Sequence, residues 1–129
     1  MSTSETTTNG VCIEVDASYA ADHSAPQLGQ WFFLYTIRIA NEGAETCQLL
    51  TRHWVIRNAT GRVEEVQGPG VVGQQPVLEP GDSFEYTSGC PLDTPFGSME
   101  GTYQMVTEAG AHFDAEIARF ELREPGAIH

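Results

Sequence analysis

The chain has 129 residues, which is enough for one domain with a single hydrophobic core. It carries 18 Asp and Glu against 6 Arg and contains no Lys, so its formal charge is −12. A surface of this sign repels nucleic acid and anionic lipid, and no apolar run approaches the roughly 20 residues that a membrane-spanning helix needs. We therefore expect no nucleic-acid partner and no membrane partner. A cation, a basic peptide or a basic protein face would be attracted, although an acidic surface more often serves only to keep a protein in solution.

The segment at residues 1–9 is rich in hydroxyl side chains and has no apolar stretch. This composition predicts a disordered N-terminal tail, followed by one domain over residues 10–129. The segment also lacks the basic region and the apolar run of a secretory signal, so we expect no export by that route.

The three cysteines, Cys12, Cys47 and Cys90, are widely spaced and include no C-x-x-C pair. Neither a zinc site nor a disulfide framework is indicated by this spacing. We expect buried thiols that serve as packing material, in a protein of the reducing cytoplasm.

Along the first half of the chain, apolar residues repeat every two positions, which is the period of a β-strand. Val11, Ile13 and Val15 predict a half-buried strand, and a loop with Pro and Gly follows at residues 22–29. Residues 31–40 predict a central strand, because Phe33, Tyr35, Ile37 and Ile39 share one face. Residues 46–57 predict a strand covered on both faces, and residues 62–66 a short, acidic edge strand.

The second half continues the same pattern, with strands expected around residues 84–88, 99–107 and 112–122 and a hairpin turn at residues 108–111. The apolar residues of the last strand change parity, which a β-bulge near Ala118 and Arg119 would explain. No window has helical spacing over three turns. The pattern predicts an all-β protein of short antiparallel strands, and composition alone leaves sandwich and barrel open.

Gly68, Gly70 and Gly73 form a G-x-G-x-x-G sequence, which in dinucleotide-binding folds places a pyrophosphate at a helix N-terminus. No helix is expected after it, because Val71 and Val72 are β-branched and Pro and Gly follow within a few residues. The backbone amides of Gly68, Gly70 and Gly73 could still hold a small anion, with Arg52, Arg57 and Arg62 as sources of positive charge. Alternatively, the glycines shape a crossing loop between two sheets, with Val71 and Val72 in the core.

The segments GPGVVGQQPVLEPG and YTSGCPLDTP, with Arg52-His53-Trp54 before them, resemble the bacterial ApaG family, and the resemblance covers about residues 11–129. The resemblance implies an immunoglobulin-like or fibronectin type III-like antiparallel β-sandwich, with about seven to eight strands. It also implies a domain found alone in bacteria and at the C-terminus of some F-box proteins and of a polymerase-delta-interacting protein. The family is linked to cobalt and magnesium homeostasis rather than to a reaction.

No catalytic set is recognisable, since Ser88 lies outside a G-x-S-x-G elbow and no Ser/His/Asp or Cys/His arrangement is present. The four histidines are scattered without metal-ligand spacing: His23, His53, His112 and His129. We therefore predict no catalytic residue, no metal site and no cofactor. Trp54 is expected in the core, His53 on the opposite face as an oriented structural imidazole, and Tyr103 as a corner tyrosine that binds a loop backbone.

These features predict a non-catalytic binding module whose partner is another protein, because a β-sandwich presents sheet edges and end loops that recognise extended segments. The alternative is a small-molecule or ion sensor that binds a divalent cation weakly, or a pyrophosphate or nucleotide at the GPGVVG loop.

Overall fold

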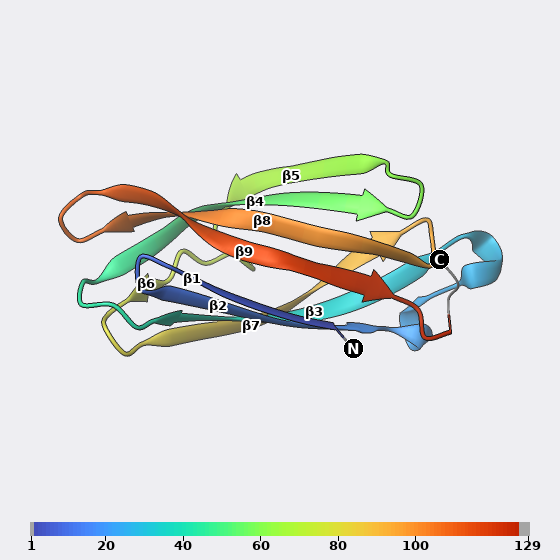
Figure 1. Ribbon diagram of the computed structural model, residues 1–129, viewed down its shortest axis with the longest axis horizontal. Helices are drawn as coiled ribbons and strands as arrows, with labels where there is room; N and C mark the ends of the chain where they lie inside the picture. The colour runs from blue at the N-terminus through green and yellow to red at the C-terminus, as the bar shows by residue number, and fades with distance from the viewer. Residues whose placement is uncertain (1, 127–129) are drawn as a thin grey trace.

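The computed structural model describes residues 2–126, so that Met1 and His129 lie outside the described residues. Within this range the chain forms nine β-strands and two short 3-10 turns (Figure 1). In chain order these are β1 Ser2–Thr8, β2 Val11–Tyr19, η1 Ala21–His23, η2 Pro26–Leu28, β3 Trp31–Asn41, β4 Cys47–Asn58, β5 Val63–Pro69, β6 Val77–Leu78, β7 Ser83–Leu92, β8 Phe96–Thr107 and β9 His112–Arg123.

The strands form two antiparallel sheets that pack face to face, so the predicted all-β sandwich is confirmed. One sheet has the order β1-β2-β3-β7, and the other has the order β5-β4-β8-β9 with the short β6 paired to the start of β4. The count exceeds the predicted seven to eight strands because β1 and the two-residue β6 were not expected.

The core lies between the sheets and is built from the residues that the two-residue period points inward. Phe33, Ile37 and Ile39 of β3 are completely buried, as their shared face predicts. Trp54 of β4 is 3% exposed, and its indole packs edge-on against Tyr35, Tyr103 and Phe120. The expectation that Trp54 anchors the core is therefore confirmed.

The prediction of a disordered tail is wrong, because residues 2–8 form strand β1. β1 pairs with β2 along its whole length and lies beside β9 of the opposite sheet. Ser4 Oγ donates to the carbonyl of Ala118 at 2.8 Å, and Thr8 Oγ1 accepts the amide of Glu116 at 3.2 Å. Polar composition suggested disorder, but threonines are good strand formers, and here the hydroxyls bind backbone groups of β9.

The parity change in the last strand has the predicted cause. The β8–β9 register shifts between Met99 and Gly101, so that Ala118 and Arg119 face a single residue of β8. This bulge lets Phe120 and Leu122 turn into the core together with Ala115 and Ile117.

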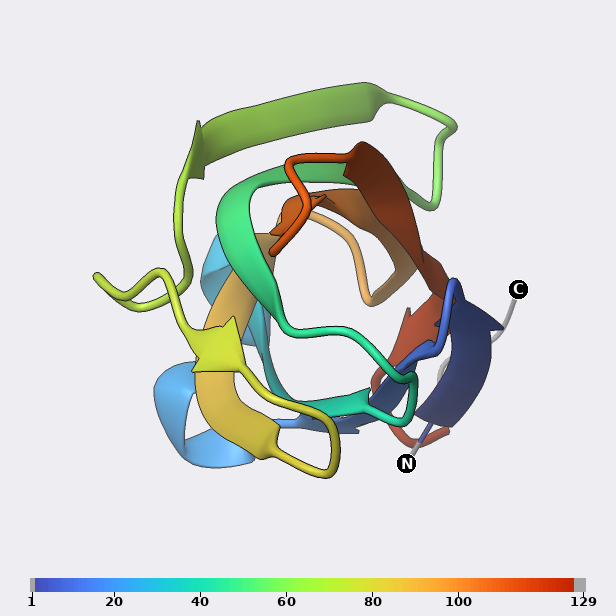
Figure 2. The same cartoon turned by 90° about the vertical axis from the view of Figure 1, so that its left-hand side faces the viewer.

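The two flanks of the sandwich differ, as the view along the strands shows (Figure 2). On one flank β1 lies against β9 and closes the space between the sheets. On the other flank the edge strands are β5 and β7, and β5 stands away from the body of the molecule. We call this second side the open flank.

Candidate functional site: the open flank

Strand β5 has the largest share of exposed residues of any strand, and within residues 2–126 it pairs only with β4. None of its residues is buried, the side chain of Glu65 is 59% exposed, and Val63 is 49% exposed. One long edge of β5 therefore faces solvent along residues 63–69.

The turn before β5 determines which of its backbone groups point outward. The Asn58 amide donates to the carbonyl of Arg62 at 3.1 Å, and at the other end the Gly70 amide donates to the carbonyl of Leu50 at 2.9 Å. Since hydrogen-bonded pairs alternate along an antiparallel ladder, Glu64, Val66 and Gly68 direct their amides and carbonyls toward β4. The backbone groups of Val63, Glu65 and Gln67 point away from β4.

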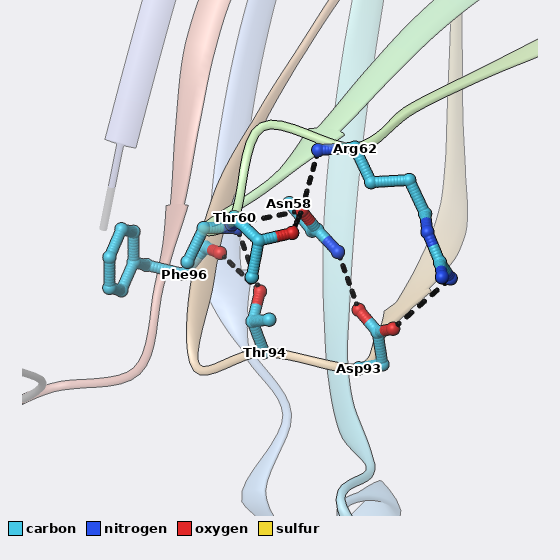
Figure 3. Close-up of polar contacts among 7 residues, drawn as sticks. Asn58, Thr60, Arg62, Asp93, Thr94 and Phe96 are labelled. Atoms are coloured by element: carbon cyan, nitrogen blue, oxygen red, sulfur yellow. Dashed lines mark hydrogen bonds and ion pairs between the residues drawn. The ribbon is translucent and has the colours of Figure 1, made fainter.

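A network of polar side chains holds the start of β5 against the loop between β7 and β8 (Figure 3). Asn58 Oδ1 accepts from the amides of Thr60 and Arg62, each at 3.0 Å, and Asn58 Nδ2 donates to Asp93 Oδ1 at 3.0 Å. Arg62 lies 3.7 Å from the other carboxylate oxygen of Asp93.

A second contact in the same place joins the Ala59 amide to Thr94 Oγ1 at 3.0 Å. Because Asp93 and Thr94 lie in the loop that joins β7 of one sheet to β8 of the other, these bonds connect the β4–β5 hairpin to that crossing loop.

A groove of about 340 Å³ lies beneath this hairpin, on the inner side of β5. Its apolar wall includes Ile56, Pro91 and Leu92, and its polar wall includes Gln30, Arg62 and Glu64. The Glu64 carboxylate makes no ion pair within residues 2–126, and it lies close enough to Cys90 to affect the thiol. Burial, with a smaller contribution from Glu64, raises the pKa of Cys90 to about 12.

The glycine loop at the far end of β5 forms a tight turn rather than a helix cap. Val71 and Gln74 exchange both backbone hydrogen bonds at 2.8 Å, and the two residues between them have positive φ, 42° for Val72 and 79° for Gly73. Gly70 also has φ of 61°, and a Cβ there would lie 2.3 Å from the Gln74 carbonyl oxygen. The expectation that no helix follows is confirmed.

This geometry uses most of the amides that an anion would need. The amides of Gly70, Val71 and Gln74 all donate to backbone carbonyls. Val71 is buried as expected, but Val72 is 55% exposed, so the prediction that Val72 packs in the core is wrong. The tight turn requires a left-handed backbone at Val72, which carries its side chain outward.

Arg52 anchors the glycine loop instead of facing a bound anion. Its Nη1 donates to the carbonyl oxygens of Pro69 and Gly70, both at 2.9 Å. Gly68 crosses directly over this guanidinium, since a Cβ on Gly68 would lie 3.2 Å from both terminal nitrogens. Gly68, Gly70 and Gly73 thus have structural roles, and anion binding by this loop stays a prediction.

Three buried tyrosines lie near Arg52, and burial raises the pKa of Tyr35, Tyr86 and Tyr103, with Arg52 opposing the effect weakly. The prediction that Tyr103 binds a loop backbone is wrong. The Tyr103 hydroxyl is hydrogen-bonded to the hydroxyl of Tyr86, because strands β7 and β8 face each other across the core.

On the outer face of the hairpin, His53 Nε2 lies 2.7 Å from Glu65 Oε1, so the imidazole connects β4 to β5 as an oriented structural group. Sequence reasoning missed one group of potential metal ligands among the described residues. Ligand atoms of Glu5, Cys12 and Glu14 lie within 4.8 Å of one another, on β1 and β2. The pairing of β1 with β2 creates this cluster, and it could not be foreseen with Glu5 assigned to a disordered tail.

Comparison with known proteins places this architecture in a family. The family model described as the ApaG domain matches residues 21–107, which include the β4–β5 hairpin and the glycine loop. The chain belongs to the ApaG domain family. The ApaG protein of Paramagnetospirillum magneticum is 53% identical over 119 residues, covering 92% of each chain. That of Thiobacillus denitrificans is 52% identical, covering 91% of this chain and 92% of the relative.

The ApaG fold is also seen in a crystal structure of a Bordetella pertussis protein, which superposes with a TM-score of 0.88 at 49% identity. The match covers 91% of this chain and 95% of that one. The names of the matching ApaG proteins indicate no catalytic activity. In the part of this ApaG chain that the structure describes, no helix combines the length and apolarity needed to cross a bilayer.

Proposed function

We propose that this ApaG-domain protein is a non-catalytic binding module that recognises another protein through the open flank. The observation that carries the proposal is the free edge of β5, where Val63, Glu65 and Gln67 direct their backbone groups away from β4. An ordered edge of this kind offers donors and acceptors at fixed spacing to an extended segment of a partner.

The surroundings of β5 support the same role. The polar network at Asn58 and the Arg52 contacts with Pro69 and Gly70 hold both ends of the strand in place. A binding edge that is already ordered loses little conformational entropy when a partner arrives. The groove beside Ile56 and Glu64 adds a place for side chains of the partner.

We place the protein in the cytoplasm, since its three buried thiols are unpaired, as a reducing compartment favours. The ApaG likeness suggests a process connected with cobalt resistance and magnesium efflux. The alternative, a sensor that holds a divalent cation or a nucleotide at the glycine loop, has weaker support because Gly70, Val71 and Gln74 already use their amides.

The test is quantitative capture of protein partners by immobilised wild type and by two proline variants, followed by affinity measurement with each purified partner. Glu65→Pro removes an outward amide of β5. Glu85→Pro is the matched control on β7, the other edge strand of the open flank. The Asn41 amide donates to the Asp82 carbonyl. Since hydrogen-bonded pairs alternate along the β3–β7 ladder, the Glu85 amide points away from β3. We expect saturable binding that weakens at least about tenfold in Glu65→Pro only.

Partners that bind both variants as tightly as wild type would contradict the use of β5. Saturable binding of a small molecule, with no saturable protein partner, would contradict the module itself.

A further inference from the structure

We infer that the segment recognised by β5 is an extended, basic stretch of the partner, added as a new strand beside β5. The inference rests on the proposed function and specifies the chemistry of its ligand. Three observations support it: the spacing of the free backbone groups, the unpaired acid in the groove, and the charge that opposes self-pairing.

The backbone groups define an extended ligand. Val63, Glu65 and Gln67 present amides and carbonyls at every second residue, which is the spacing that a neighbouring strand uses. β5 contains no proline before Pro69, so nothing in residues 63–68 interrupts a new ladder. A partner strand of about five to six residues would satisfy these groups.

Side-chain charge selects a basic ligand. Glu64 projects on the inner side of β5 and lies beside Ile56, Pro91 and Leu92 in the groove. Within the described residues its carboxylate has no cationic partner, although the neighbouring acids Glu65 and Asp93 pair with His53 and Arg62. Arg or Lys fits this place, because its apolar stem can cover Ile56 and Leu92 while its charge reaches Glu64.

The same charges oppose pairing of β5 with a second copy of this chain. Antiparallel pairing of two β5 strands centred on Glu65 would place Glu65 of one copy opposite Glu65 of the other, and like charges directly opposite each other destabilise a sheet. Each copy also carries a formal charge of −12. The acidic edge therefore repels a second copy of the chain and attracts a positively charged segment.

The probe for the test is a synthetic nine-residue peptide that alternates lysine and threonine, with blocked ends, and the comparison probe replaces every lysine with glutamate. Each is titrated into the full-length protein while its amide spectrum is recorded. We expect the lysine peptide to bind with a Kd of about 1 mM or tighter, with the largest shifts at Val63, Glu65 and Gln67. The amides of these residues should also exchange more slowly in the complex.

Variants separate strand addition from general attraction to an acidic protein. Glu64→Gln should weaken binding of the lysine peptide severalfold, and Glu65→Pro should abolish it. Asp114→Asn removes one negative charge from an exposed position of β9 on the opposite flank and should leave the affinity unchanged within about twofold.

Two binding results would overturn the inference: no saturable binding of the lysine peptide at peptide concentrations of roughly a few millimolar, or equally tight binding of the glutamate peptide. Amide shifts dispersed over acidic residues outside β5, or self-association of the protein through β5 in sedimentation, would also overturn it. Its failure is distinguishable from that of the proposed function. If a captured partner needs β5 but the lysine peptide does not bind, the module stands and the basic strand is refuted. If the peptide binds β5 but no protein partner does, the proposed function falls.

Discussion

The hydroxyl groups of Tyr86 and Tyr103 are hydrogen-bonded to each other in the interior and join the two sheets of the sandwich. Tyr103→Phe would leave the Tyr86 hydroxyl buried without its partner, at a cost of about 1–3 kcal/mol in the free energy of unfolding. The double variant Tyr86→Phe/Tyr103→Phe removes both groups and should cost less than the single change. Urea denaturation measures all three, and a double variant whose loss equals the sum of the single losses would refute the pairing.

The raised pKa of Cys90 makes stability depend on alkaline pH. Its ordinary pKa is 9.0 and burial raises it to about 12, so the folded state retains a proton that the unfolded chain releases between these values. The stabilisation is complete below about pH 9 and is lost as pH rises toward 12, by up to about 1.4 kcal/mol per pH unit from this thiol. Raised pKa values of Tyr86 and Tyr103 act in the same direction.

Guanidinium unfolding at several pH values between neutral and strongly alkaline measures this slope. Cys90→Ala should flatten it while leaving the tyrosine contribution, whatever its effect on stability at neutral pH. An unchanged slope in Cys90→Ala would show that the thiol ionises equally in the folded and unfolded chains.

The backbone at Val72 stores strain that a better turn residue should release. Its φ of 42° is unusual for a β-branched residue, and a turn with two positive φ values favours Asn followed by Gly. Val72→Asn, which precedes Gly73, should therefore raise the free energy of unfolding by about 1 kcal/mol. The matched control Val77→Asn changes an equally exposed valine in β6 and should bring no gain. Destabilisation by Val72→Asn would argue against the turn.

Arg52 should be required for an ordered glycine loop. Arg52→Met keeps most of the apolar stem but removes both hydrogen bonds to the carbonyls of Pro69 and Gly70. We expect a loss of about 1–3 kcal/mol in unfolding free energy and faster amide exchange at Gly70 and Val71. Arg123→Met, at an exposed position of β9, is the control and should cost less than about 0.5 kcal/mol. Unchanged exchange in the loop would contradict the anchoring role.

The fold was largely predictable because alternation along strands determines which face each residue takes. Phe33, Ile37 and Ile39 followed this rule, and so did the bulge near Ala118, which the parity change required. Strand β1 was missed because its stability depends on hydroxyl contacts between Ser4 or Thr8 and the distant strand β9, and composition contains no information about that neighbour.

The open flank was only partly predictable. The acidic residues of β5 indicated an edge strand, but the outward direction of the Glu65 amide depends on the hydrogen-bond register set by the Asn58–Arg62 turn. The G-x-G-x-x-G sequence suggested an anion site, whereas Gly68 and Gly70 accommodate the Arg52 guanidinium and a tight turn. Such contacts depend on three-dimensional packing between strands that are distant in sequence.

The most direct test of the open flank is amide hydrogen exchange in the free wild-type protein, resolved residue by residue along β5. The amides of Val63, Glu65 and Gln67 should exchange rapidly, while those of Glu64, Val66 and Gly68, which bond to β4, should be protected. Equally slow exchange in both sets would show that the outer edge of β5 is already covered and would contradict its use as a docking edge.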